Sequence, residues 1–191
     1  MLTRERQIAI EIAVVELLED YGFHSYPRSI REVLQALDVD LIRYSDLADE
    51  EQKLVNLASR DKALNVTSHD YMRAQVVCDD TAGSDFLRAR FSGGHEVGHI
   101  WLEHEEDTPN REEEADYFSG YLLAPHPLVI TLPSGSAGHA ISDRFGVGSW
   151  CASFARDQAK ARQKEGGPWR PHEKWLLEHS DWKGGGLFGR A

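Results

Sequence analysis

The sequence predicts one α+β domain, in which several helices pack with a short antiparallel or mixed sheet of about three strands. Apolar side chains recur with a helical period over most of the chain. Three short segments rich in β-branched and aromatic residues lie between these helices. At 191 residues and 41% hydrophobic composition, the chain can bury one sizeable core. These three observations together set the predicted fold class.

The first half of the chain contains two predicted helices and the three predicted strands. A helix is expected over residues 4–20, where apolar residues share one face. Ser29 and Glu32 have the spacing of a capping box, so a second helix should begin there. The predicted strands are residues 39–44, 74–79 and 86–91.

The second half should be helical, with glycine-rich breaks near its end. The expected helices are residues 93–104, 110–124 and 140–164, the last interrupted at Gly146. We place the domain at residues 1–165 and a Gly- and Trp-rich C-terminal tail at 166–191. Three of the five tryptophans fall in this tail, which we expect to dock on the domain.

Charge and composition exclude several classes of protein. The net charge of −11 disfavours direct nucleic-acid binding, because that binding depends on neutralising phosphates. The longest apolar-rich run, residues 8–18, is interrupted by Glu11 and Glu16, so no membrane contact is expected. No signal-peptide pattern opens the chain and it has only two cysteines, so we expect a cytoplasmic protein.

The motif that carries chemistry is His95-Glu96-Val97-Gly98-His99. On a helix, His95 and His99 are separated by about 40° around the axis and roughly 6 Å along it. Two imidazoles so placed can bind one Zn²⁺, although similar ligands also accept Mn²⁺. Glu96 lies on the same side of the helix, where it can act as the general base on a water molecule.

The third metal ligand should come from the next helix, which begins with several acidic residues. Glu112 and Asp116 lie one turn apart on one face, so we assign Glu112 as a ligand. Asp116 should orient a ligand imidazole through its second ring nitrogen. His104 is rejected as a ligand, because on a continued helix it lies about 180° from His95. A simpler reading is an acidic helix start that favours the helix dipole.

Together these residues carry a family resemblance. His95-Glu96-x-x-His99, then Glu112-x-x-Ala115-Asp116-x-Phe118 and Leu122-Leu123-Ala124-Pro125, resembles the ImmA/IrrE family of zinc metallopeptidases. The resemblance spans roughly residues 26–160 and implies a small zincin-like fold with Zn²⁺ as cofactor. It matches His95, His99 and Glu112 to metal ligands and Glu96 to the catalytic carboxylate. Gly93-Gly94 departs from the family pattern, and either admits a substrate backbone or loosens the helix entry.

The resemblance implies a zinc-dependent metalloendopeptidase that cleaves a helix-turn-helix transcriptional repressor, or a similar regulatory protein, by metal-activated water attack. A protein group should also stabilise the developing oxyanion. The residues considered for that role are Tyr117, Tyr121, His126 and His139. The acidic stretch 103–116 either steers a basic protein partner or is simply solvated.

Two alternatives remain open from the sequence. In the first, the chain is a non-catalytic module that keeps its metal and sequesters a regulator without cutting it. In the second, residues 140–164 bind DNA directly, because their spacing resembles a helix-turn-helix. Packing of the same segment as a helical hairpin on the domain fits the negative charge of the chain better.

Overall fold

The computed structural model describes residues 2–43, 46–58, 63–67, 74–78, 86–105, 108–133 and 138–182. The helices are α1 (Arg4–Asp20), α2 (Ile30–Ala36), α3 (Asp49–Ala58), α4 (Phe86–Trp101), α5 (Pro109–Leu123), α6 (His126–Ile130), α7 (Gly138–Phe145), α8 (Ser149–Glu165) and α9 (Pro171–His179). The strands are β1 (Ser25–Tyr26), β2 (Asp40–Arg43), β3 (Ala63–Thr67), β4 (Ala74–Cys78) and β5 (Asp181–Trp182).

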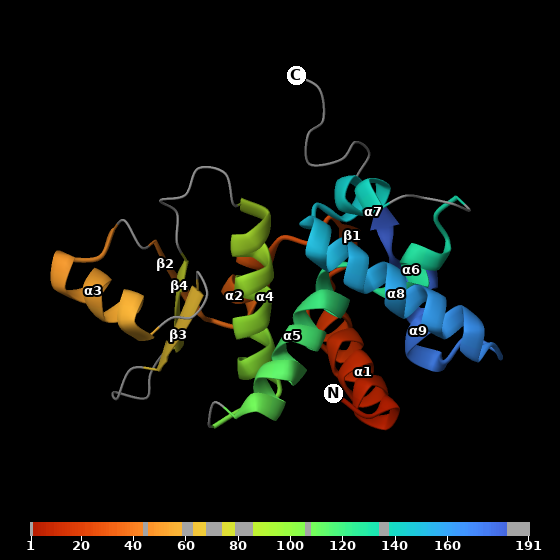
Figure 1. Ribbon diagram of the computed structural model, residues 1–191, viewed down its shortest axis with the longest axis horizontal. Coiled ribbons are helices and arrows are strands. Elements are labelled where there is room, and N and C mark those ends of the chain that lie inside the picture. Colours follow the sequence, from red (N-terminus) through yellow and green to blue (C-terminus); the bar gives the residue numbers. More distant parts are fainter. Residues whose placement is uncertain are drawn as a thin grey trace, which may run out of the picture.

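The strands are short, with two to five residues each. β4 is the central strand of a small sheet, paired parallel with β2 and antiparallel with β3. The two-residue strands β1 and β5 pair parallel with each other. Figure 1 shows the small sheet and α3 on one side of α4, with α1, α5, α6, α8 and α9 gathered on the other side.

The predicted α+β fold class is wrong, because the protein is mostly helical and its core is built by helices. Most members of the described hydrophobic core cluster belong to helices, above all α1, α2, α5 and α8. The strand predicted over residues 86–91 is also wrong, because this segment forms the first turns of α4. The apolar residues of this segment fit the spacing of a strand and also that of a helix. Contact with α5, including the hydrogen bond from Ser119 to the Phe91 carbonyl, favours the helix.

Capping side chains define where the helices begin. Ser29 accepts a hydrogen bond from the Glu32 backbone at 3.3 Å, which confirms the predicted start of α2. Thr108 caps α5 in the same way, and Pro109 occupies its first turn, where a missing N–H costs nothing. These caps place Glu112 in the first turn of α5.

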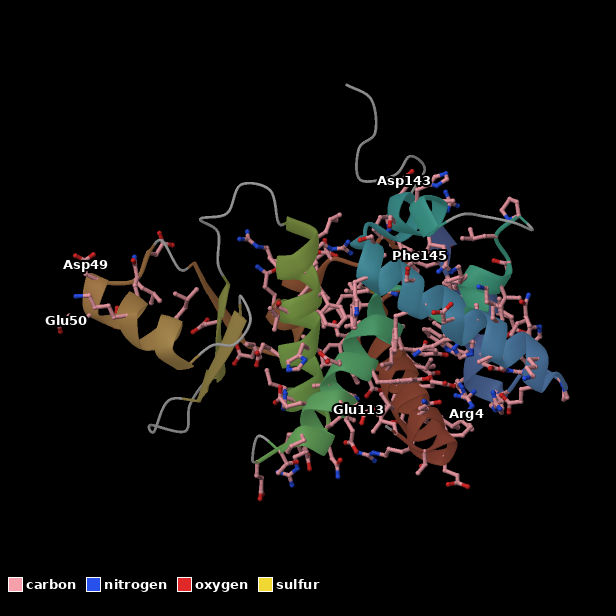
Figure 2. All side chains as sticks on the ribbon, in the orientation of Figure 1. Arg4, Asp49, Glu50, Glu113, Asp143 and Phe145 are labelled. Atoms are coloured by element: carbon pink, nitrogen blue, oxygen red, sulfur yellow. The ribbon has the colours of Figure 1, made fainter. Side chains whose placement is uncertain are left out.

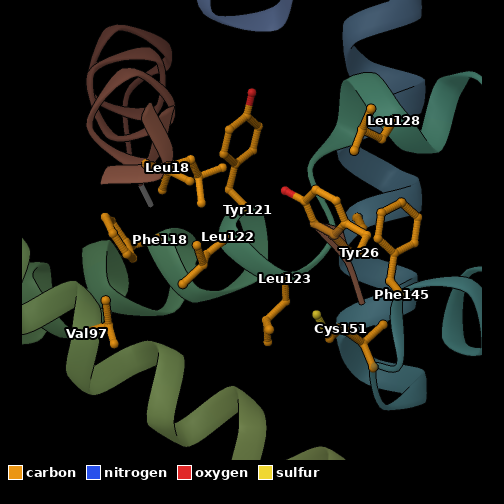
Figure 3. Close-up of a cluster of buried hydrophobic side chains, with 14 of the residues drawn as sticks. Leu18, Tyr26, Val97, Phe118, Tyr121, Leu122, Leu123, Leu128, Phe145 and Cys151 are labelled. Carbon is orange, nitrogen blue, oxygen red and sulfur yellow. The ribbon is translucent and has the colours of Figure 1, made fainter. Parts of the chain in front are cut away.

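The core centres on α5, which contacts α1, α4 and α8. Figure 3 shows Phe118 and Leu122 of α5 between Leu18 of α1 and Val97 of α4. All four side chains are fully buried. Burial of such side chains contributes about 1.5–3 kcal/mol each, so α5 is the helix that holds the others in place.

Close packing between α4 and α5 depends on glycine. A Cβ atom added to Gly98 would lie 3.1 Å from the Ala115 Cα, and one added to Gly94 would lie 2.6 Å from the Ser119 Oγ. A Cβ added to Gly93 would lie 2.8 Å from the side chain of Ile30. The glycine pair therefore makes room for α2 and α5, and the idea that it admits a substrate backbone is wrong.

The C-terminal segment docks on the domain as predicted, as far as the structure describes it. α9 contacts α1 and α6, and its residues Glu173 and Leu176 are completely buried. The ring of Trp169 lies under the Arg162 guanidinium, 5.3 Å from ring centroid to Cζ. Residues 183–191 lie outside the described part. None of the helices described here has the length and apolar character needed to cross a bilayer.

Candidate metal centre

Three side chains from α4 and α5 converge on one point, which we call the histidine site: His95, His99 and Glu112. The Nε2 atoms of His95 and His99 lie 3.0 Å apart. Glu112 places Oε2 3.5 Å from the His95 Nε2, and Oε1 3.3 Å from the His99 Nε2. Ligand atoms held tetrahedrally at about 2.0–2.1 Å from Zn²⁺ are separated by about 3.3 Å. The three separations therefore fit a zinc ion.

Asp116 orients His95 from behind. Its Oδ1 lies 2.8 Å from the His95 Nδ1, so that nitrogen donates its proton to the carboxylate. The Nε2 lone pair of His95 is then directed at the His99 Nε2 and the Glu112 carboxylate. Atoms with lone pairs repel one another at this distance unless a proton or a metal cation lies between them. The geometry thus calls for a ring N–H or a metal cation between these atoms, and a cation can satisfy both rings and the carboxylate at once.

The surroundings of His95 favour positive charge at its ring. Burial by itself lowers the pKa of His95, because it penalises the charged ring. The hydrogen bond that His95 donates to Asp116 and the charges of Asp116, Glu96 and Glu112 outweigh burial, so the net pKa of His95 is raised. The carboxylates of Asp116, Glu96 and Glu112 would stabilise a bound metal cation in the same way.

Glu96 lies beside these ligands without being one of them. Its side chain is only 8% exposed, and its charge contributes to the raised pKa of His95. Glu112 is 49% exposed, so the site is open on the α5 side. The arrangement therefore has three residues that could hold a metal ion, an adjacent carboxylate and access from solvent.

His104 has a role that helical extrapolation missed. α4 ends at Trp101, and Glu103 adopts a left-handed φ of 54°. The His104 N–H then bonds the His99 carbonyl at 2.9 Å, which is the Schellman ending of a helix. This turn brings the His104 Nδ1 to 3.1 Å from the His99 Nδ1. Nothing in the sequence signalled it, because position 103 is not glycine.

Glu114 of α5 and Arg6 of α1 hold the His104 ring on the side away from His99. The His104 Nε2 lies 3.1 Å from the Glu114 Oε2, and Arg6 of α1 holds the same carboxylate through two hydrogen bonds. Burial lowers the pKa of His104, and Arg111 and Arg6 lower it further, against the raising effect of Glu114. His104 therefore stays neutral and can share one proton with His99.

A second cluster, which we call the buried network, lies between α1, α6, α8 and α9. Glu11, His126 and Glu173 have ligand atoms within 4.8 Å of one another and are buried. The sequence signal for this network was Glu11, a charge flanked by Ile10 and Ile12 in the apolar-rich run 8–18, since a charge that is buried needs a partner. Its members are Glu11, His126 and Glu173 with Arg4, Tyr117, Arg162, Arg170 and His172.

The carboxylates of the buried network already have their partners. Glu173 accepts hydrogen bonds from the Arg162 Nε at 2.6 Å and Nη2 at 2.9 Å, and from Arg170. Glu11 accepts from the Arg4 Nη1 at 2.7 Å, and Arg4 points from α1 toward the C-terminal helices in Figure 2. The guanidinium groups supply the positive charge that a metal would bring. The donor set therefore does not fit a metal ion.

The residues considered as oxyanion donors are placed mainly around this network. The Tyr117 hydroxyl donates to Glu11 at 2.8 Å, and the His126 Nε2 lies 3.2 Å from Glu173. Tyr121 is completely buried, with its ring 5.3 Å from that of His126. His139 is exposed on α7. Tyr117 and His126 are thus used in holding the helices together.

Comparison with models of protein families, with curated protein sequences and with solved structures finds no match to this chain. The resemblance to the ImmA/IrrE family therefore remains a prediction from the residues that carry it. Function has to be argued from the site itself.

Proposed function

We propose that the chain is a zinc-dependent metalloendopeptidase centred on the histidine site. One observation carries the proposal: two imidazole nitrogens and a carboxylate converge at zinc-ligand separations, with Asp116 behind one ring. An accidental pair of surface histidines would not be expected to have a third ligand and an orienting carboxylate supplied by a different helix.

Each residue of the site has a distinct task in hydrolysis. His95, His99 and Glu112 would hold the metal, and Asp116 and His104 contact the two rings from behind. When bound, zinc supplies a Lewis acid that polarises the scissile carbonyl and acidifies water. The Glu96 carboxylate takes a proton from the attacking water and delivers it to the departing amine.

The substrate class follows from the resemblance and from charge. We propose a helix-turn-helix repressor or a similar regulatory protein, cleaved in the cytoplasm. Glu112, a ligand in this proposal, and Asp116 behind His95 are each about half exposed, so the site presents acidic groups to solvent. Such carboxylates attract a basic protein, and repressors that bind DNA carry basic surfaces. Direct DNA binding by residues 140–164 gains no support, since α8 buries Ala152, Ala155 and Ala159.

The test separates catalysis from simple sequestration. The wild-type chain, Glu96→Gln and the matched exposed control Glu178→Gln are loaded with zinc and incubated with a helix-turn-helix repressor, with and without a chelator. Mass spectrometry of the repressor then measures cleavage. We expect Glu96→Gln to bind zinc but to cleave at least about a hundredfold more slowly, and Glu178→Gln to match wild type.

Two results would reject the proposal. Cleavage by Glu96→Gln at the wild-type rate would remove Glu96 from the chemistry. Stable zinc-dependent binding of the repressor, with no cleavage by any variant, would favour the sequestering module over a peptidase.

A further inference from the structure

An aromatic patch lies on the surface beside the histidine site; it consists of Phe91, Trp150 and Phe154. Trp150, in the first turn of α8, is 59% exposed, more than the other exposed large hydrophobic residues, Ile12 and Tyr21, within the described part of the chain. Its ring stacks on Phe154, with centroids 5.7 Å apart and planes 5° apart. Phe91 meets the same ring edge-on at 5.0 Å. The indole is therefore exposed to solvent but held in one orientation.

The patch and the histidine site share the seam between α4 and α5. These helices run antiparallel, since Gly98 faces Ala115 while Gly94 faces Ser119 further along α5. Continuing in this direction, the Phe91 carbonyl accepts a hydrogen bond from Ser119 at 2.7 Å. Phe91 precedes His95 by four residues, which is roughly 6 Å along α4 and about 40° around it.

Contacts along α5 also place the aromatic patch near the histidine site. Gly120 follows Asp116 by one turn of α5, and a Cβ added to Gly120 would lie 2.9 Å from the Phe154 ring. Phe154 thus rests on α5 one turn beyond the carboxylate that orients His95. The aromatic patch is therefore about one helical turn from His95 along α4, and one turn from Asp116 or two turns from Glu112 along α5.

A bound peptide would bring side chains to this distance. An extended chain advances about 3.3 Å per residue, and its side chains alternate between two faces. With the scissile carbonyl at the metal, a side chain one or two residues away reaches the patch. An apolar ring placed there would bury surface against an indole that is already fixed, with little loss of side-chain freedom.

We infer that Trp150 is a specificity-determining residue, which receives a large apolar side chain, preferably aromatic, within two residues of the scissile bond. This inference rests on the proposed function, because it needs a peptide whose carbonyl lies at the histidine site. Trp150 acts by direct contact with substrate, and Phe91 and Phe154 hold its ring.

The test uses metal-binding hydroxamates on the zinc-loaded full chain. Acetohydroxamate probes the metal alone, whereas N-acetylphenylalanine hydroxamate and benzylmalonic hydroxamate carry a phenyl ring on either side of the chelating group. Calorimetry should show that one of the two phenyl compounds binds about tenfold tighter than acetohydroxamate. Trp150→Ala should abolish this preference and leave acetohydroxamate binding unchanged. Trp150→Phe should keep most of the preference, and the control Tyr21→Ala should keep all of it.

The outcomes separate this inference from the proposed function. Equal binding of all three hydroxamates, or a preference that survives Trp150→Ala, would overturn the role of Trp150 and leave the metal site in place. Failure of every hydroxamate to bind the zinc-treated chain would overturn both. Sedimentation of the same variants tests a second copy of the chain as the occupant. A dimer that Trp150→Ala dissociates, with the preference unchanged, would overturn the inference in favour of self-association.

Discussion

The histidine site and the buried network contain the same kinds of residue and differ in what surrounds them. Each brings histidine and glutamate side chains within 4.8 Å of one another. In the buried network, arginine side chains fill the space around the carboxylates and hydrogen-bond to their oxygens. In the histidine site, the ring nitrogens face each other and a half-exposed carboxylate.

The difference teaches that residue type and proximity do not by themselves define a metal site. The buried network needs positive charge because its carboxylates are completely buried, and the histidine site attracts it because two ring nitrogens and a carboxylate converge there. Where guanidinium groups from the chain supply that charge, the cluster fastens helices. Where the described part of the chain places no such group at the centre, the cluster can take a cation from solution. The predictions below test this distinction.

The largest expected effect is on stability, from Glu173→Gln. This change leaves Arg162, which is 5% exposed, without its counter-charge, so unfolding should become easier by about 3–5 kcal/mol. Urea unfolding measures the loss. The matched control is Asp157→Asn, which removes the exposed contact with Lys160 and should change stability by less than about 1 kcal/mol. Equal losses in the two variants would show that the buried network does not fasten the helices.

Acid should weaken the buried network in a defined pH range. Burial opposes ionisation, but the histidine and arginine partners outweigh it and hold the pKa of Glu11 and of Glu173 below the ordinary 4.5. A lowered pKa contributes stability that is present above about pH 4.5 and is lost as the pH falls through the folded value. The stability gap between wild type and Glu173→Gln should therefore be full near pH 7 and narrow below about pH 4.5. A gap that widens on acidification would contradict this account.

The next effect is on metal affinity, from Asp116→Asn. The amide can no longer hold a proton at the His95 Nδ1 as a carboxylate does, so zinc should bind about 10–100-fold more weakly. Competition with a fluorescent chelator measures this affinity. Asp143→Asn, on α7, is the matched control and should bind zinc as wild type does. Unchanged affinity in Asp116→Asn would mean that the 2.8 Å contact does not orient the ring.

A smaller effect is expected from Gly98→Ala, which tests the packing behind the site. The added Cβ would lie 3.1 Å from the Ala115 Cα, and backbone cannot move aside as a side chain can. Separation of α4 from α5 should cost about 1–3 kcal/mol of stability and weaken zinc binding. Gly138→Ala is the control, because its Cβ would lie 3.9 Å from a nitrogen of the flexible Arg156 side chain, which is ordinary van der Waals contact. Similar behaviour of the two variants would remove Gly98 from the account.

Much of the histidine site could be predicted from the sequence, because it depends on helical spacing. The positions of His95, His99, Glu112 and Asp116 follow from the 3.6-residue period on two neighbouring helices. His104 could not be placed in this way, because it lies beyond the left-handed turn at Glu103, where the period no longer applies.

The fold was predicted less well, for two physical reasons. Short apolar segments such as residues 86–91 satisfy strand and helix patterns equally, and only tertiary contacts decide. From sequence alone, a tyrosine or histidine such as Tyr117 or His126 can be interpreted either as a catalytic group or as part of a buried hydrogen-bond network. Which role they take depends on partners far away in the sequence, such as Glu11 and Glu173.

Zinc stoichiometry in matched histidine variants tests the central claim most directly. Equilibrium dialysis followed by elemental analysis would compare wild type, His99→Gln and His126→Gln. The account predicts about one zinc ion per chain for wild type and for His126→Gln, and none for His99→Gln. Zinc retained by His99→Gln but lost from His126→Gln would move the metal to the buried network and contradict the account.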